Sequence, residues 1–244
     1  MSLQTLLERY KNHYATIAGQ HQHDDAAALA VGGEFYTIGA LEYYVLKAHG
    51  LNDSTHVVDI GCGTGRLAAQ LASRKHPHYS GFDIMESAVT YARDLCQMPG
   101  WKFGVTDGLT IDVPDETGDM ACFFSVFTHL SHEHTYLCLK EAARLLKPGG
   151  IVIFTYLEFA VYSHWEAFAK AVKNFGKEAE PVVFLDRAGI TLFANHLDFD
   201  VLALVDGDKP TFKIEEELNL GPCVLLKDRG LLGQSIAILQ KRAK

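Results

Sequence analysis

The N-terminal fifth of the chain has hydrophobic residues at helical spacing. Between residues 2 and 18 the apolar positions recur every three or four residues, which predicts an amphipathic helix. Residues 21–35 break this pattern with polar side chains and a glycine pair. Residues 38–50 return to helical spacing and end at Gly50, a residue that favours a helix C-terminus. We therefore expect residues 1–50 to form a helical cap.

From residue 51 onward, short apolar runs alternate with amphipathic stretches, which predicts a doubly wound, mostly parallel α/β sheet. The expected strands are residues 55–61, 78–83, 101–107, 119–127, 151–159, 200–208 and 234–241. The expected helices are residues 65–74, 85–96, 133–146, 163–176 and 187–199. The segment between the last two strands is too long for a tight hairpin. We therefore expect residues 51–244 to form one domain.

Charge and cysteine content narrow the functional classes. The net charge of −8, from 22 basic and 30 acidic residues, disfavours general binding to nucleic acids. Five cysteines, an odd number without a CxxC pair, indicate a reducing, cytoplasmic setting. The N-terminus does not look like a signal peptide, and no apolar run is long enough to cross a bilayer.

The sequence VVDIGCGTG at residues 57–65 predicts a strand that turns into a helix around a ligand. Gly61, Gly63 and Gly65 permit positive φ angles and remove side chains from the turn. The dinucleotide fingerprint GxGxxG needs a further glycine where this chain has Arg66. A carboxylate at Asp59 would repel a pyrophosphate and suit an ammonium or sulfonium group. The alternative is that these glycines form only a tight structural turn.

Two further acidic positions follow the next strands. Asp83 ends the second strand, where a carboxylate can accept hydrogen bonds from both ribose hydroxyls, and Ile84 can pack on an adenine ring. Asp107 and Gly108 follow the third strand, where a carboxylate can accept from the adenine amino group. The alternatives are a helix N-cap at Asp83 and an ordinary Asp-Gly turn at residue 107.

Together these motifs resemble the class I S-adenosylmethionine-dependent methyltransferases, including FD at 82–83, TDG at 106–108, DMACFFSVFTHL at 119–130 and EAARLLKPGG at 141–150. The resemblance implies a Rossmann-like seven-stranded sheet whose last strand is antiparallel, and S-adenosyl-L-methionine as cofactor. It also implies that Asp83 holds the ribose and that the 107–108 turn frames the adenine. The methionine part would face the turn, and the end of the fourth strand would lie near the sulfonium. The residues facing the methionine part would be Asp59, Gly61, Cys62, Gly63 and Gly65. Those near the sulfonium would be Ser125, Val126 and Phe127.

Candidate acceptor-side residues lie after the fourth and fifth strands, where ligands bind in open α/β sheets. His129 and Glu158 are the candidate general bases for an oxygen acceptor. His132 and His134 fit better as solvated residues of a helix capped by Ser131. We expect no metal site, because three converging ligands are hard to assemble at this spacing. The polar cluster of His21, His23, Asp24 and Asp25 fits better as a solvated loop.

The acceptor pocket is expected to use Tyr36 and Tyr43 from the cap and His164 after the fifth strand. The glycine pair at residues 32–33 suits a hinge that lets the cap close over the cofactor. The alternative for these aromatic residues is ordinary packing.

The sequence therefore predicts a methyltransferase that acts on a small molecule, at oxygen, in the cytoplasm. The absence of an NPPY-type motif argues against amino methylation of DNA bases or glutamine. One alternative is a non-enzymatic module that binds S-adenosylmethionine. Another is a nicotinamide-dependent oxidoreductase, which would require a glycine at position 66. We expect no nucleic-acid or membrane partner, and the sequence leaves the oligomeric state open.

Overall fold

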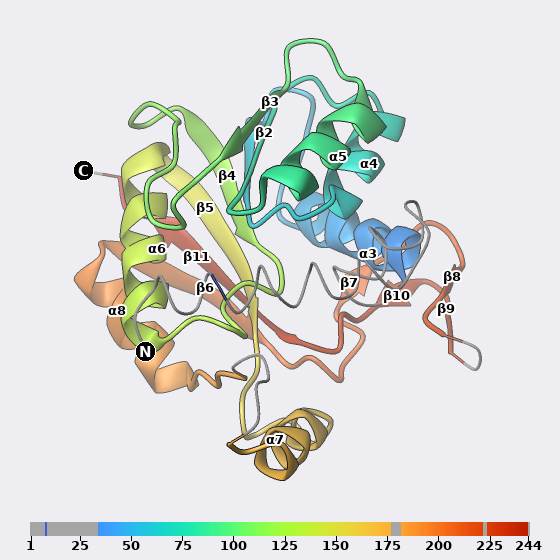
Figure 1. The fold of residues 1–244 in the computed structure, drawn as a ribbon, viewed down its shortest axis with the longest axis vertical. Helices are drawn as coiled ribbons and strands as arrows, with labels where there is room; N and C mark the ends of the chain where they lie inside the picture. Colours follow the sequence, from blue (N-terminus) through green and yellow to red (C-terminus); the bar gives the residue numbers. More distant parts are fainter. Residues whose placement is uncertain (1–7, 9–33, 177–181, 222–223, 244) are drawn as a thin grey trace.

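A seven-stranded sheet forms the centre of the computed structural model, which describes residues 8, 34–176, 182–221 and 224–243. Its strands follow the order β3-β2-β1-β4-β5-β11-β6 (Figure 1). Their bounds are β1 Val57–Ile60, β2 Tyr79–Asp83, β3 Lys102–Val105, β4 Gly118–Phe123, β5 Leu146–Tyr156, β6 Phe199–Val205 and β11 Ser235–Lys241. The last strand, β11, lies between β5 and β6 and is antiparallel to both, whereas the other pairs are parallel. This confirms the fold class that the sequence predicts.

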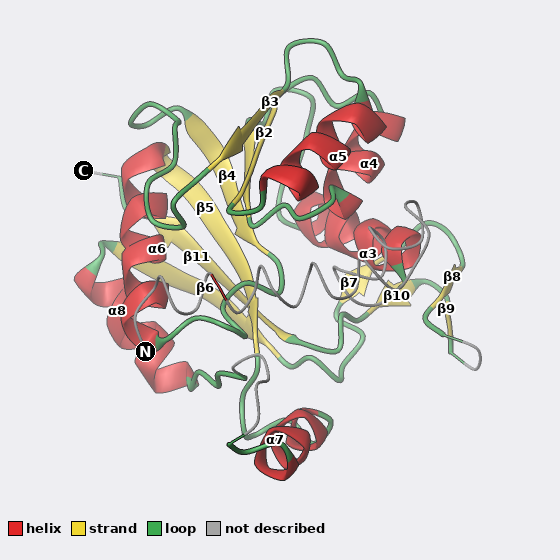
Figure 2. Ribbon diagram, viewed as in Figure 1, coloured by secondary structure: helices red, strands yellow, loops and turns green. Residues whose placement is uncertain are grey.

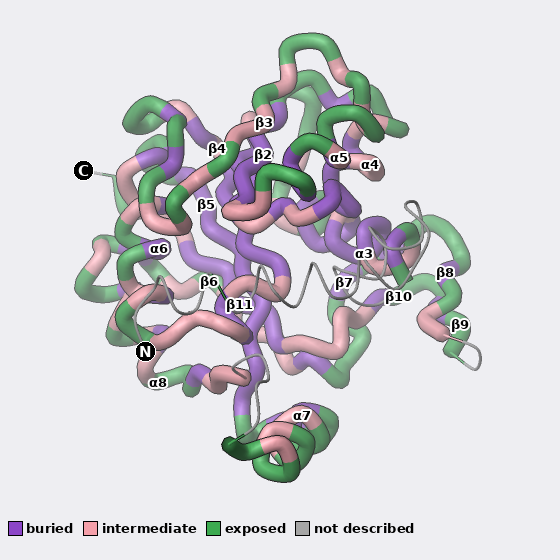
Figure 3. Tube along the Cα trace, viewed as in Figure 1, coloured by how far each residue is buried: buried purple, intermediate pink, exposed green. Residues whose placement is uncertain are grey.

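Helices cover both faces of this sheet (Figure 2). Their bounds are α3 Phe35–Ala48, α4 Arg66–Ser73, α5 Glu86–Cys96, α6 His132–Leu145, α7 His164–Lys173 and α8 Arg187–His196. One hydrophobic cluster joins α6 and α8 to the sheet, and a second joins α3 and α4 to the opposite face. Because both faces are covered, Val57 and Val58 are each fully buried although they point in opposite directions. Figure 3 shows the central strands buried and α7 largely outside the core.

Two segments differ from their predicted structure. The strand β5 begins directly after α6 at Leu146, because Leu146 already pairs with Gly118 of β4, so the KPGG turn belongs to the strand. Residues 209–233 contain two small antiparallel sheets, which pair β7 (Phe212–Lys213) with β10 (Arg229–Gly230) and β8 (Leu218–Asn219) with β9 (Leu225–Leu226). Strands of two residues show no hydrophobic alternation and could not be read from the sequence.

The cap region is described only from residue 34 onward, apart from Glu8. The predicted helix at 2–18 and the cluster of His21, His23, Asp24 and Asp25 therefore lie outside the described residues. The helix predicted at 38–50 is α3, which begins earlier, at Phe35. It packs against α4 and shares a buried cluster with β1, while the division into two parts at residue 50 stays a prediction. Within the described ranges, no helix is both long and apolar enough to cross a membrane.

Candidate functional site

The three glycines after β1 have backbone conformations that other residues rarely adopt. Their φ angles are 80° at Gly61, 53° at Gly63 and 87° at Gly65. A Cβ atom on Gly61 would lie 2.4 Å from Cγ2 of Val126, and one on Gly65 would lie 2.8 Å from Cβ of Ala92. The glycines are therefore needed both for the turn and for close packing against the segment after β4 and against α5.

The amides of this turn donate to acceptors inside the protein. The amides of Gly61 and Cys62 donate to the carbonyl of Phe82 at 2.7 and 3.0 Å. The amide of Gly65 donates to the carbonyl of Cys62 at 3.0 Å. The amide of Gly63 donates to the Asp83 carboxylate at 2.8 Å. A pyrophosphate site needs amides that point at the ligand, and these four are already engaged. The turn therefore fits a ligand without phosphates better than a dinucleotide.

Asp83 joins the glycine turn to the start of α5. Its second carboxylate oxygen accepts from the amide of Met85 at 2.9 Å. Burial raises the pKa of Asp83, although its backbone hydrogen bonds oppose the rise. Met85 rather than Asp83 is the N-cap residue of α5. The carboxylate therefore stands at the carboxyl end of β2 and supports the turn from its neighbouring strand.

The segment after β3 is held between Ile84 and α6. A Cβ atom on Gly108 would lie 3.5 Å from Cγ2 of Ile84. Gly108, predicted to frame the adenine, and Ile84, predicted to pack on it, are therefore neighbours. Asp107 accepts from the amides of Leu109 and Thr110, and these bonds lower its pKa. This is the Asx turn that the structural alternative predicts, and the side chain is otherwise exposed.

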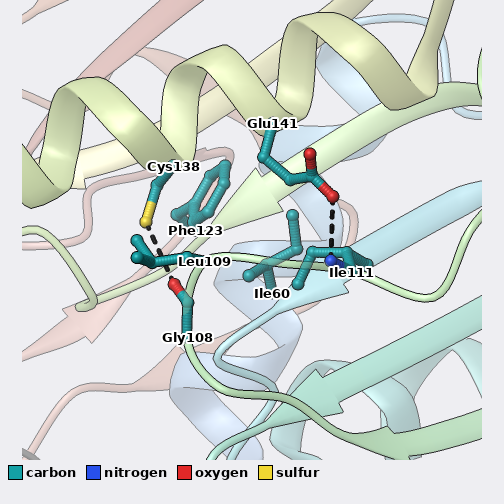
Figure 4. Close-up of a pocket in the computed structure, with 7 residues that line it drawn as sticks. All are labelled: Ile60, Gly108, Leu109, Ile111, Phe123, Cys138 and Glu141. Carbon is teal, nitrogen blue, oxygen red and sulfur yellow. Dashed lines mark hydrogen bonds between the residues drawn. The ribbon is translucent and has the colours of Figure 1, made fainter.

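Figure 4 shows how the same loop is fastened to α6 around a small, largely apolar pocket. The Cys138 thiol donates to the carbonyl of Gly108 at 3.5 Å, and Glu141 accepts from the amide of Ile111 at 2.8 Å. Ile60 and Phe123 line the pocket from β1 and β4. These contacts fix the position of the segment after β3 relative to the ends of β1 and β4.

Asp59 lies beneath the glycine turn and has partners on both oxygens. It accepts from the Tyr79 hydroxyl at 2.8 Å and from the Cys122 thiol at 3.6 Å. The residue is 3% exposed, and burial raises its pKa to about 7. In this conformation Asp59 supports the turn from within the core and does not lie open to a ligand.

Arg66 forms a buried ion pair that the sequence analysis missed. Its guanidinium lies 2.6 Å from Glu42 of α3 and 3.4 Å from the Ser125 hydroxyl. Burial raises the pKa of Glu42, and the charge of Arg66 opposes this rise. The sequence did carry one signal for this pair. Glu42 interrupts the apolar face of a predicted helix, and a buried charge needs a partner of opposite charge.

Ser125 marks the carboxyl end of β4 with a strained backbone. Its φ angle is 59°, in the left-handed region that costs a non-glycine residue energy. Its amide donates to Thr155 at 2.7 Å, and its hydroxyl accepts from the Gln234 amide at 3.2 Å. Strand β5 and the residue directly before β11 therefore hold Ser125 in place beside the glycine turn.

Phe127 is placed differently from its two neighbours. Its ring is fully buried between Phe123 and Phe154, with ring centroids 4.7 and 5.0 Å away. Only its backbone is therefore available to a ligand in this conformation. Val126, which contacts Gly61, is half-buried.

The histidines after β4 separate into two groups. His129 lies half-buried in the turn beyond β4, where its amide donates to the carbonyl of Val126 at 3.1 Å. Ser131 is the N-cap of α6 and accepts from the amide of His134, as the alternative interpretation predicts. His132 contacts the carbonyl of Phe184 at 3.0 Å. Among the described residues, no group of three potential metal ligands comes together.

Glu158 is buried and already saturated with hydrogen bonds. Arg187 binds its two carboxylate oxygens at 2.8 and 2.9 Å, and the Ser235 hydroxyl donates at 2.6 Å. Burial favours a higher pKa, but Arg187 and Ser235 outweigh it and lower the pKa of Glu158. A carboxylate held in this way is a poor general base.

The three predicted acceptor-binding residues do not come together. Both ring nitrogens of His164 lie 3.0–3.1 Å from backbone atoms of Glu158 and Gly233, so this buried ring fastens β5 to the segment before β11. Tyr43 packs under the guanidinium of Arg74, which follows the end of α4 opposite the glycine turn. Tyr36 is 68% exposed in the first turn of α3.

Part of the chain is similar in sequence to known methyltransferases. Residues 57–150 match a family model described as "Methyltransferase domain". Over 141 residues the chain is 28% identical to 27-O-demethylrifamycin SV methyltransferase of Amycolatopsis mediterranei. This match covers 56% of this chain and 51% of that protein. Over 105 residues it is 30% identical to a ubiquinone biosynthesis O-methyltransferase of Maricaulis maris, with coverages of 41% and 40%. The matched part of the chain thus spans about half of the length of the first relative and 40% of the second.

A solved structure extends the likeness to nearly the whole fold. Magnesium protoporphyrin IX methyltransferase from Synechocystis PCC 6803, with bound S-adenosylhomocysteine, matches with a TM-score of 0.61 at 16% identity. The match covers 94% of this chain and 93% of that one. The strand order and the match to the family model lead to one conclusion. Residues 57–150 carry a methyltransferase domain, and the fold around them is that of the class I S-adenosylmethionine-dependent methyltransferases, whose cofactor is S-adenosylmethionine.

Proposed function

We propose that this protein transfers a methyl group from S-adenosylmethionine to an oxygen atom of a small-molecule acceptor. The observation that carries the proposal is the glycine turn, whose amides are engaged and which stands between Asp83 and Ser125 at the strand ends. The four cysteines within the described residues are free thiols, which supports a cytoplasmic setting.

Different residues at the carboxyl ends of the strands would contact the ribose, the adenine and the methionine part of the cofactor. When bound, S-adenosylmethionine supplies an activated methyl group on a sulfonium. Asp83 offers a carboxylate to the ribose hydroxyls, and Ile84 and Gly108 border the adenine. Gly61 and Ser125 border the methionine part. The protein then contributes mainly alignment, which is worth about 7–11 kcal/mol for well-oriented groups.

His129 is the residue we assign to accept the acceptor's proton. It follows the end of β4 by six residues, near the strained Ser125, and an imidazole nitrogen can accept a proton. Proton transfer to His129 would accompany formation of the new C–O bond and release of the thioether product. An oxygen acceptor is supported by the ubiquinone biosynthesis O-methyltransferase among the relatives, whose name states that chemistry.

Helix α3 also belongs to the proposal. Tyr36, which is exposed in the first turn of α3, would contact the acceptor. We propose that the acceptor is neither a nucleic acid nor a membrane, because the chain carries a net charge of −8.

A labelled methyl transfer assay tests the proposal. Purified protein would be incubated with tritiated S-adenosylmethionine and a panel of phenols, catechols, carboxylic acids, amines and thiols. We expect labelled product with an oxygen acceptor. His129→Gln should lower kcat by roughly 10²–10⁴-fold without weakening cofactor binding. The matched control is His134→Gln, in the first turn of α6, which should retain activity.

Two outcomes would contradict parts of the proposal. Labelling of amines alone would remove the oxygen specificity and the need for a base at His129. Tight cofactor binding without turnover on any acceptor would favour a non-enzymatic binding module.

A further inference from the structure

Four aromatic rings gather where β5 leaves the sheet and α7 begins. We call Phe159, Trp165, Phe168 and Phe184 the aromatic cluster. Phe159 stacks on Phe184 with centroids 4.3 Å apart and planes 9° from parallel. Phe168 meets both of these rings edge-on, at 5.3 and 5.9 Å, and Trp165 lies 5.0 Å from Phe168. The cluster thus forms one connected apolar surface.

Much of this surface faces solvent. Phe159 is 58% exposed and Trp165 is 54% exposed. Helix α7, which lies beyond the carboxyl end of β5 in Figure 1, buries only His164 among its ten residues. Leaving large rings in water forfeits the free energy of burying them, and contiguous exposed apolar surface marks binding sites.

Hydrogen bonds place the aromatic cluster beside the segment that follows β4. The amide of Val183 donates to the carbonyl of Thr128 at 2.8 Å, and His132 contacts the carbonyl of Phe184 at 3.0 Å. Thr128 and His132 flank His129, the assigned base. Phe184 also forms an isolated bridge with Leu157, directly after β5. The cluster therefore continues the edge of the sheet that carries the proposed acceptor chemistry.

One charge beside the aromatic cluster, that of Glu158, is neutralised by its partners. Glu158 adjoins Phe159 in sequence, but its carboxylate is paired with Arg187 and bonded by Ser235. The backbone amide of Glu158 donates to Nδ1 of His164, and Nε2 of His164 contacts the carbonyl of Gly233. An acceptor at this surface would meet flat rings and no unpaired carboxylate from Glu158.

We propose that the aromatic cluster binds the methyl acceptor and that the acceptor carries a flat, uncharged aromatic ring system. The inference rests on the proposed methyltransferase function, because it takes the cluster to be the acceptor side of that site. Stacked and edge-on ring contacts select planar aromatic groups over aliphatic ones of similar size.

Equilibrium dialysis with 2-naphthol as the probe tests this directly, in the presence of S-adenosylhomocysteine. We expect 2-naphthol to bind, and Phe159→Ala and Trp165→Ala each to weaken it about fivefold. Phe175→Ala is the matched control, because Phe175 is 92% exposed just after α7 and lies outside the cluster. It should leave binding unchanged, and cyclohexanol should bind at least fivefold more weakly than 2-naphthol.

Each alternative gives a different result. Equal binding by the wild type and both cluster variants, or no binding of 2-naphthol, would overturn the inference. Self-association that Trp165→Ala abolishes, without 2-naphthol binding, would assign the surface to a second copy of the chain. Calorimetry with S-adenosylhomocysteine separates this from the proposed function: loss of cofactor binding refutes the function, whereas intact cofactor binding with an inert cluster refutes only the inference.

Discussion

Gly61 and Gly50 both have positive φ angles, but only Gly61 is closely packed. Gly50 has nothing within 4 Å of an added Cβ, whereas Gly61 would place it 2.4 Å from Val126. Gly50→Ala should therefore cost only backbone strain, about 1–2 kcal/mol of unfolding free energy. Gly61→Ala should cost about 1–3 kcal/mol more from overpacking. Urea unfolding measures both, and adding Val126→Ala should recover the packing part; equal losses at the two glycines would contradict the account.

Asp59 should make stability depend on pH. Its folded pKa of about 7 lies above the ordinary 3.8, because burial outweighs the bonds from Tyr79 and Cys122 and the charge of Arg66, and Glu42 adds to the rise. A raised carboxyl pKa stabilises the fold fully below about pH 4, and the contribution is lost as pH rises to about 7. Asp59→Asn should flatten the unfolding free energy over this range. Parallel pH profiles for the two proteins would refute the assignment.

At the scale of elements, the Glu158–Arg187 pair joins the end of β5 to the start of α8. Removing Arg187 leaves the buried Glu158 carboxylate without its main partner, and Arg187 is itself 43% exposed. Arg187→Ala should therefore cost about 1–3 kcal/mol in chemical unfolding near neutral pH. The control is Lys209→Ala, which removes an exposed pair with Asp206 and should cost well under 1 kcal/mol.

The acid side of the pH profile gives a second check on this pair. Because the pKa of Glu158 is lowered in the fold, its contribution is present above its ordinary 4.5 and is lost as pH falls through the folded pKa. The deficit of Arg187→Ala should therefore shrink in acid. Combining it with Glu158→Gln should recover part of the loss, and no recovery would show that the carboxylate is not the source.

The elements of the sheet could be predicted from the sequence, while the links between them could not. The apolar run at 57–60 and the glycines after it carry their signal locally, so β1 and its turn were found. The Glu42–Arg66 pair joins residues 24 positions apart through the packing of α3 on α4, and neither residue signals its partner. His164 and Glu158 were predicted from their position after β5 alone, and only the structure shows their hydrogen bonds to Gly233 and Arg187.

At the scale of the whole molecule, the fold brings the ends of β1, β2 and β4 together at one edge. The amide of Gly63 and the carboxylate of Asp83 meet there at 2.8 Å, and Ser125 is held beside the turn by Thr155 of β5 and by Gln234, directly before β11. Residues far apart in the sequence thus form the edge that we propose binds the cofactor, and the aromatic cluster lies on the proposed acceptor side of this edge. The account requires that this edge bind an adenosyl ligand without phosphates.

Calorimetric titration of the wild type and of Asp83→Asn with S-adenosylmethionine, S-adenosylhomocysteine and NADH tests this most directly. Asparagine keeps one oxygen for the amide of Gly63, but it loses the charge offered to the ribose and the second oxygen, which accepts from the amide of Met85. We predict that the wild type binds both adenosyl ligands and not NADH, and that Asp83→Asn weakens them about 10–100-fold. Binding of NADH, or full affinity in Asp83→Asn, would contradict the account.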